Sequence, residues 1–159
     1  MSTMSIHQAG IVDLEVLSVL FDGYRQFYGR DSNLAAAKQF LLDRFNHAES
    51  VVFIAYEGSN PIGFTQLYPS FSSVSLERIF ILNDLFVTES GRRKGVGSAL
   101  ISAAVEYAKA VGALRLGLST ALTNTNAQAL YESEGWERDD DFFYTYAIRH
   151  EVTRQSNMT

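Results

Sequence analysis

Apolar residues recur with helical spacing near the beginning of the chain. Leu14, Leu17, Phe21, Tyr24 and Tyr28 are separated by three or four residues, which predicts an amphipathic helix. A second helix is expected to follow, because another apolar set has the same spacing and candidate capping residues stand before it. This set is Ala37, Phe40, Leu41 and Phe45, with Ser32 or Asn33 as the N-cap.

Residues that favour strands dominate the next part of the chain. The runs VVFIAYE (51–57) and PIGFTQLY (61–68) predict a hairpin, because the segment GSN between them is a turn signal and Pro61 stands at its exit. The segment SFSSVS (70–75) is expected to be a loop. LERIFILNDLFV (76–87) then predicts a long strand, in which the polar Asn83 and Asp84 need a partner or a function.

The pattern changes back to helical spacing at Gly95. Apolar residues recur from Val96 to Val111, and Gly112 stands where a C-terminal glycine cap belongs. Beyond it we expect a strand in LRLGLST (114–120), a short helix in NTNAQALYESEG (124–135) and a last strand in FFYTYAI (142–148). Asn124 is expected to cap the short helix and Gly135 to close it. The final HEVTRQSNMT (150–159) is polar, and we expect it to be frayed.

Length and charge restrict the class of protein. A chain of 159 residues that is 47% hydrophobic can bury one core but hardly two, so we expect one domain over residues 1–150 and a polar tail over 151–159. The net charge of -5 argues against a nucleic-acid or membrane-surface binder, since both need a basic face. No apolar run approaches the roughly 20 residues that span a bilayer, and MSTMSIHQAG lacks the apolar core of a signal peptide. We therefore expect a cytoplasmic protein.

Metal and thiol chemistry are not expected. The chain has no cysteine, which excludes disulfides, thiol nucleophiles and cysteine-bound zinc. Its three histidines, His7, His47 and His150, lie far apart in the sequence. No metal site is therefore predicted.

The segment GRRKGVGSALI (91–101) has the composition of a phosphate site. Glycine leaves backbone amides bare at the start of a helix, and Arg92, Arg93 and Lys94 stand beside them. Neither the P-loop pattern nor the dinucleotide fingerprint matches, because Leu100 stands where the latter needs its third glycine. The alternative is that Gly95 and Gly97 only shape a turn and that the three cations are solvated.

A second motif favours the phosphate interpretation. NTNAQALYESEGW reads N-x-x-A-x-x-L-Y-x-x-x-G-W and, with R-x-x-G-x-G about thirty residues earlier, resembles the GCN5-related N-acetyltransferase (GNAT) superfamily. Trp136 replaces the commoner phenylalanine of the motif. The resemblance covers roughly Leu82 to Trp136. It implies an α/β fold with a mixed, mostly antiparallel sheet that is splayed to admit acetyl-CoA and flanked by helices.

The resemblance also implies which residues hold acetyl-CoA. The loop after the long strand would bind the pyrophosphate, and the end of that strand would bind the pantetheine arm and the thioester. Asn124 caps its helix in either case, and in this family it can also bond the pantetheine. The implied set is Leu85, Phe86, Val87, Arg92, Arg93, Lys94, Gly95, Val96, Gly97, Ser98 and Asn124, with the amide of Val87 as candidate donor to the thioester oxygen.

Two residues are candidates for proton transfer. Tyr131 matches the family tyrosine that protonates the departing thiolate, and a phenol with a pKa near 10 is protonated at neutral pH; the alternative is ordinary packing. Asp84 is the candidate base that deprotonates the amine, and the alternative is a carboxylate paired with an arginine. Relatives often have a glutamate at the position of Asn83. Because a bulge is expected here, the sequence does not decide which of Asn83 and Asp84 faces the cleft.

The expected reaction is direct acetyl transfer to a primary amine in a ternary complex, without an acetyl-enzyme. The acceptor class is a small basic amine, a polyamine or a lysine-like amine. Asp139, Asp140 and Asp141 either attract this cation or form a solvated hairpin tip. The alternatives are a non-catalytic acyl-CoA-binding module, a protein or histone-tail lysine acetyltransferase, and an unrelated phosphate-binding domain. The resemblance also implies a homodimer formed through the C-terminal strands.

Overall fold

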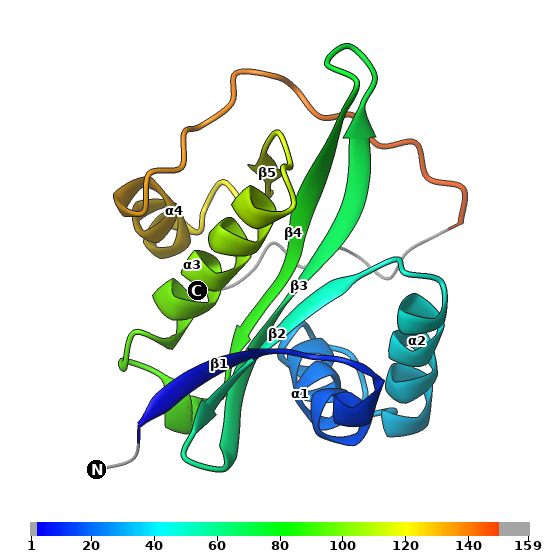
Figure 1. Ribbon diagram of the computed structural model, residues 1–159, viewed down its shortest axis with the longest axis vertical. Coiled ribbons are helices and arrows are strands. Elements are labelled where there is room, and N and C mark those ends of the chain that lie inside the picture. The colour runs from blue at the N-terminus through cyan, green and yellow to red at the C-terminus, as the bar shows by residue number, and fades with distance from the viewer. Residues whose placement is uncertain (1–2, 150–159) are drawn as a thin grey trace. The chain divides into compact units, whose positions relative to one another are not determined.

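The computed structural model describes residues 3–149 (Figure 1). Contacts divide the chain into two units, Met1–Leu118 and Ser119–Thr159. The elements of the first unit are β1 (Met4–Gln8), a 3-10 turn (Ile11–Asp13), α1 (Leu14–Phe27), α2 (Leu34–Asn46), β2 (Val51–Glu57), β3 (Asn60–Ser72), β4 (Glu77–Val87), a 3-10 turn (Glu89–Gly91), α3 (Val96–Ala110) and β5 (Leu116–Gly117). The second unit contains α4 (Thr125–Ser133).

The five strands form one sheet whose spatial order is the chain order, β1-β2-β3-β4-β5. The first three pairings are antiparallel, whereas β4 and β5 are parallel and pair only at Phe80 with Leu116 and Ile81 with Gly117. The expected α/β fold with a mixed, mostly antiparallel sheet is therefore confirmed. Because β5 ends at Gly117, no strand of the first unit, among its described residues, pairs with the second half of β4 on the edge opposite β3.

Helices cover both faces of this sheet. Figure 1 shows α1 and α2 on one side of it and α3 on the other. The side chains of successive strand residues point to opposite faces of the sheet, as in any pleated strand. Ile54 and Phe64 pack in a core with Leu17 and other residues of α1 and α2. On the other side, the ring of Tyr107 in α3 lies 5.8 Å from that of Phe53.

Most elements that the pattern predicts are present, and their caps agree with the expected positions. Asn33, not Ser32, caps α2, since its side chain accepts a hydrogen bond from the amide of Ala36. Gly112 follows α3 with φ of 73°. The turn 58–59 joins β2 to β3 as expected.

The structure corrects the sequence interpretation at several places. Residues 4–8 form β1, which was not predicted, and β3 continues through Ser72, so that only the second half of SFSSVS is a turn. The strand expected in 114–120 is reduced to Leu116–Gly117. Residues 142–148 form no strand, and their large side chains are exposed.

These last residues matter for two other expectations. Without a strand at 142–148, the acids 139–141 are not a hairpin tip; instead the Asp139 carboxylate accepts the amides of Asp140 and Asp141. A dimer built on C-terminal strands stays a prediction. The polar residues 150–159 lie outside the described part of the chain.

Candidate active site

A β-bulge in β4 determines where its polar residues point. Gln66 of β3 faces Asp84, but the next residue, Leu67, faces Leu82, so Asn83 is an extra residue with no partner across the ladder. An inserted residue reverses the alternation of a strand. Phe80, before the bulge, contacts Tyr107 of α3, whereas Phe86, after it, packs against Tyr24 of α1. The bulge therefore turns Asp84 towards α1.

Asp84 lies in a buried polar cluster. Its side chain is 2% exposed, and its two carboxylate oxygens accept the Nε2 of Gln66 at 2.5 Å and the Nδ2 of Asn83 at 2.8 Å. The phenol of Tyr24 lies near the carboxylate, because it lowers the pKa of Asp84 and Asp84 in turn raises the pKa of Tyr24, after burial as the first cause of each shift. No arginine forms an ion pair with Asp84 among the described residues. Amides and a phenol thus take the place of the arginine that the alternative interpretation required.

Burial alters the proton affinity of this cluster. It raises the pKa of the Asp84 carboxyl, and the hydrogen bonds from Gln66, Asn83 and Tyr24 oppose that rise in part. The pKa values of Tyr24, Tyr28 and Tyr68 are raised too, first by burial and then by the nearby negative charge of Asp84. These phenols are therefore protonated at neutral pH and can donate hydrogen bonds towards the carboxylate.

One acceptor atom of the cluster has no partner. Gln66 is fully buried, and its Oε1 has no hydrogen-bond partner within residues 3–149. A buried acceptor without a donor costs about 1–3 kcal/mol, so this atom offers a favourable site for an incoming N–H group. Sequence reasoning missed Gln66, Tyr24 and Tyr28. The signal for Gln66 was present, because it is a polar residue inside the apolar run PIGFTQLY.

The bulge also orients backbone groups at the end of β4. The amide of Thr88 donates to the carbonyl of Ile62 at 2.8 Å, which places the amides of even-numbered residues here on the β3 side. The amides of Leu85 and Val87 therefore point to the opposite edge, where β5 has already ended. Donors on such an open edge can hold a carbonyl oxygen. The family resemblance makes the Val87 amide the candidate for this role, which stays a prediction.

The glycine loop connects this edge to α3. Gly95 is the N-cap of α3 in the left-handed region, with φ of 75°, and has no side chain to cap the helix. The next residues, Val96, Gly97 and Ser98, form the first turn of α3. The first amides of a helix have no partner inside it, so they form a site for an anion at its positive end. The loop therefore has the geometry of a phosphate site.

The cations beside this loop differ in their contacts. Arg92 donates from Nε to the carbonyl of Val87 at 3.4 Å, and its guanidinium lies over the ring of Phe27. Lys94 pairs with Glu57 at 3.0 Å. Arg93 is exposed and has a positive φ of 64°. Arg92 thus links the loop to the same β4 edge, while Lys94 would have to leave Glu57 to meet a phosphate.

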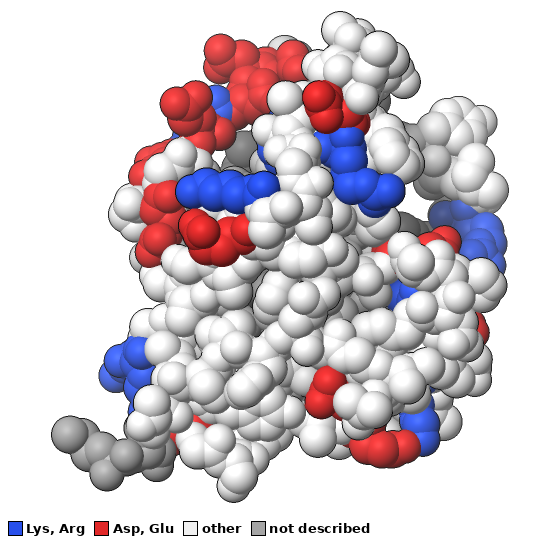
Figure 2. Space-filling view, viewed as in Figure 1, with Lys and Arg blue, Asp and Glu red and all other residues white. Residues whose placement is uncertain are grey.

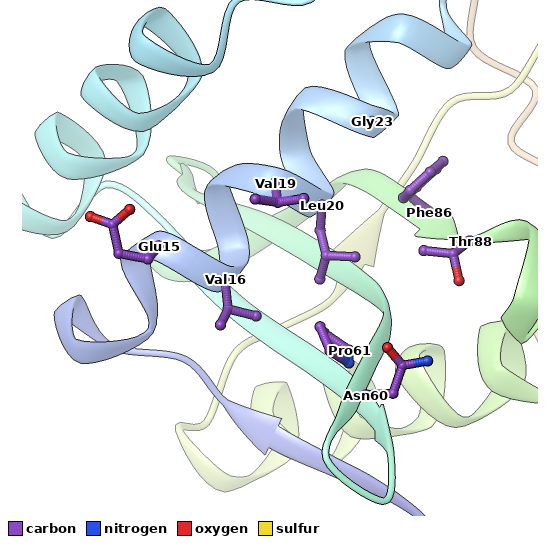
Figure 3. Close-up of a pocket in the computed structure, with 9 residues that line it drawn as sticks. All are labelled: Glu15, Val16, Val19, Leu20, Gly23, Asn60, Pro61, Phe86 and Thr88. Atoms are coloured by element: carbon purple, nitrogen blue, oxygen red, sulfur yellow. The ribbon is translucent and has the colours of Figure 1, made fainter.

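One cavity of the first unit lies between α1 and the adjoining ends of β3 and β4 (Figure 3). It measures about 540 Å³, and Val16, Val19 and Leu20 of α1 form one wall. Its only carboxylate belongs to Glu15, which pairs with Lys38. Phe86 and Thr88 bring the end of β4 to the opposite wall of this cavity.

The second unit holds the other two predicted residues. Asn124 caps α4, because its side chain accepts the amide of Ala127 at 3.2 Å. Tyr131 lies in the last turns of α4, with its ring 6.0 Å from that of Trp136, and its carbonyl accepts the amide of Trp136 at 3.0 Å. Gly135 permits this turn with φ of 93°. The motif thus forms a capped and closed helix, and the role of the Tyr131 phenol stays a prediction.

Charged side chains of both signs are spread over the face drawn in Figure 2. Figure 2 shows the lysine and arginine side chains of the visible face as separate groups, several of them beside acidic side chains. Among the described residues, no helix has both the length and the apolarity to cross a membrane. The same part of the chain contains no group of three metal-binding side chains, and His150 lies outside it.

Comparison with known proteins agrees with this geometry. The profile of the acetyltransferase (GNAT) family matches residues 16–136, which span both units. The uncharacterized N-acetyltransferase YhfO of Bacillus subtilis (strain 168) is 49% identical over 141 residues, covering 89% of this chain and 95% of the relative.

Two solved structures have the same fold. The crystal structure of a probable acetyltransferase has a TM-score of 0.87 at 42% identity, covering 92% of this chain and 99% of the other. The aminoglycoside N-acetyltransferase AAC(6')-Iy in complex with CoA has a TM-score of 0.77 at 21% identity, covering 94% of this chain and 97% of the other. From the profile, the relatives and the site, we conclude that the chain belongs to the GNAT family of acetyltransferases and is an enzyme of the N-acetyltransferase class.

Proposed function

We propose that this enzyme transfers the acetyl group of acetyl-CoA to the primary amine of a small basic or lysine-like acceptor by direct attack. The buried cluster of Asp84, Gln66 and Tyr24, next to the open edge of β4, is the observation that carries the proposal. The cluster supplies a carboxylate and a buried acceptor oxygen, and the same strand supplies backbone donors. A cationic amine fits the first two groups, and a thioester oxygen fits the donors.

The donor site rests on the end of β4 and the start of α3. The uncapped first turn of α3 fits a pyrophosphate, and a solved structure with the same fold is a complex with CoA. Acetyl-CoA supplies the acetyl thioester. The amides of Leu85 and Val87 hold the pantetheine arm and the thioester oxygen, and Arg92 supports this edge through the Val87 carbonyl. In this proposal, Asn124 also bonds the pantetheine.

The cluster around Asp84 accepts the proton that the amine must lose. An ammonium group has a pKa near 10.4, so it needs a base before it can attack. The raised pKa of the Asp84 carboxyl makes it a better base than an ordinary aspartate. Because Asp84 is buried, the nearby Tyr24 phenol relays the proton.

The reaction balances with one further proton donor. The N–C bond forms while the C–S bond breaks, two protons leave the original ammonium, and one proton is taken up by the departing thiolate. We assign this last transfer to the phenol of Tyr131. The net products are the N-acetylated amine, free coenzyme A and one proton in solution.

Two measurements test the proposal. Titration calorimetry with coenzyme A should show binding that is lost in Gly97→Val, because a branched side chain in the first turn of α3 blocks approach to its amides, and only weakened in Arg92→Ala. A thiol-release assay with acetyl-CoA and a panel of primary amines should show turnover. Undiminished coenzyme A binding in Gly97→Val would refute the donor site. Binding without turnover on any amine would show a non-catalytic module.

A further inference from the structure

A second, smaller cavity of the first unit carries one charge of each sign. It measures about 350 Å³ and is lined by Phe40, Arg44, Glu49, Tyr68 and Pro69. The Nε of Arg44 lies 3.3 Å from a carboxylate oxygen of Glu49. The guanidinium also lies over the ring of Phe40, 4.5 Å from its centroid. A cation–π contact and an ion pair therefore hold the arginine in place at the cavity wall.

Strand β3 contributes a residue both to this cavity and to the Asp84 cluster. Tyr68 and Gln66 are two residues apart, so both side chains are on the α1–α2 side of the sheet, about 7 Å from each other along the strand. Gln66 donates to Asp84, and the ring of Tyr68 lines the cavity. The phenol of Tyr68 is within electrostatic reach of both charges, because Asp84 raises its pKa and Arg44 lowers it.

We propose that the acceptor is a free diamino acid of the lysine or ornithine type, with its α-carboxylate at Arg44, its α-ammonium at Glu49 and its side-chain amine at Asp84. The side chain of such a molecule is apolar between its two ends, and it passes along the ring of Tyr68. The distance between Gln66 and Tyr68 is comparable with the length of that side chain. The side-chain nitrogen is the one that forms the bond to the acetyl carbon, and the rest of the reaction balances as above. This inference rests on the proposed acetyl transfer and identifies its acceptor.

The charges of the cavity exclude related acceptors. A diamine without a carboxylate would leave Arg44 without its ligand and would bring a second ammonium near it. An opposite charge is favourable at such a site and a like charge is unfavourable. A lysine within a peptide has neither the free carboxylate nor the free α-ammonium. The cavity should therefore favour the free amino acid over both.

The test compares acceptors that differ by one group. Thiol release with saturating acetyl-CoA is measured for lysine, for cadaverine, which lacks the carboxylate, and for 6-aminohexanoate, which lacks the α-ammonium. We expect kcat/KM for lysine to exceed that for each analogue by about 10-fold to 100-fold, as for one lost charged hydrogen bond. Mass spectrometry of the lysine product should place the acetyl group on the side-chain nitrogen.

Variants assign each effect to its residue. Arg44→Gln should raise KM for lysine and 6-aminohexanoate by about 10-fold or more and leave kcat/KM for cadaverine unchanged or higher. Glu49→Gln should lower kcat/KM for lysine and leave kcat/KM for 6-aminohexanoate unchanged. Arg115→Gln removes an exposed arginine near β5 and is the matched control, expected to behave as wild type. Circular dichroism and the coenzyme A affinity of each variant report whether it is folded.

The outcomes separate this inference from the proposed function. The diamino-acid assignment would be overturned if folded Arg44→Gln lost the same factor in kcat/KM with every acceptor. It would also be overturned if the wild-type enzyme had equal kcat/KM for lysine and cadaverine. Turnover confined to other amines, with no effect of Arg44→Gln, would do the same while leaving the acetyl transfer intact. Absence of thiol release with every amine would overturn the proposed function itself.

Discussion

Replacing Asp84 by asparagine removes the charge of this side chain while keeping its shape. In wild type the carboxylate accepts hydrogen bonds from Gln66 and Asn83. In the variant the new Oδ1 can still accept the Nε2 of Gln66, and the new Nδ2 can donate to the Oδ1 of Asn83 once the Asn83 amide turns over. We therefore expect Asp84→Asn to change the free energy of unfolding at neutral pH by less than about 1 kcal/mol.

Asp84→Ala provides the contrast. It leaves the buried Nε2 of Gln66 without an acceptor, and an unsatisfied buried donor costs about 1–3 kcal/mol, so the loss should be at least of this size. Urea unfolding followed by circular dichroism measures both variants. Equal destabilisation by asparagine and alanine would refute the hydrogen-bond argument.

The pH dependence tests the charge directly. Because burial raises the pKa of the Asp84 carboxyl, the native protein keeps this proton to a higher pH than the unfolded chain does, whose value is about 3.9. The contribution of the Asp84 carboxyl to the free energy of unfolding is therefore fully present below the unfolded-state pKa. It is lost as the pH rises through the native pKa. Asp84→Asn lacks this slope, so its stability relative to wild type should increase with pH. If the stability difference between Asp84→Asn and wild type were constant from pH 4 to pH 8, or if the variant lost stability relative to wild type as the pH rose, the raised pKa would be contradicted.

Three further results are expected. Tyr131→Phe should lower kcat by about 10²-fold to 10⁴-fold and leave coenzyme A affinity unchanged in calorimetry, whereas parallel losses would indicate packing. Asp22 accepts the Ser32 hydroxyl and the Asn33 amide, which lower its pKa, so its stabilising effect is present above about pH 4 and disappears as the pH falls through the native pKa. Asp22→Asn should accordingly cost about 1–3 kcal/mol in urea unfolding at pH 7 and progressively less in acid. Gly91→Ala should cost about 1–3 kcal/mol, because its Cβ would lie 2.9 Å from that of Ile62, and an unchanged melting temperature would contradict this packing.

Local patterns were sufficient to predict most elements of the first unit. The helical spacing from Leu14 and the strand-rich run up to Val87 depend on neighbours in the chain, and so do the caps at Asn33 and Asn124. The strand β1 was missed because its edge position and mixed polarity give no clear alternation. The segment 142–148 has the composition of a strand, but composition alone does not supply a neighbouring strand to pair with.

The candidate site was predictable where it is local and not where it depends on register. The glycine loop could be found from its spacing, since Gly95 and the start of α3 are adjacent in sequence. The side on which Asp84 lies depends on the single extra residue Asn83, and only the pairing with β3 reveals it. Gln66 and Tyr24 could not be connected to Asp84 without the fold, because they come from another strand and from a helix.

The agreement between sheet order and chain order has a consequence for how the protein folds. The strands β2, β3 and β4 are joined by short turns and can form hairpin by hairpin, whereas β1 must close a long loop before Met4 meets Glu57. Closing a long loop costs entropy before any contact compensates it, and contacts distant in sequence slow folding. We expect the amides of the central hairpins to become protected from hydrogen exchange before those of β1. The bulge at Asn83 belongs to that early part, so the register that turns Asp84 towards α1 would be selected before the outer strand β1 is in place.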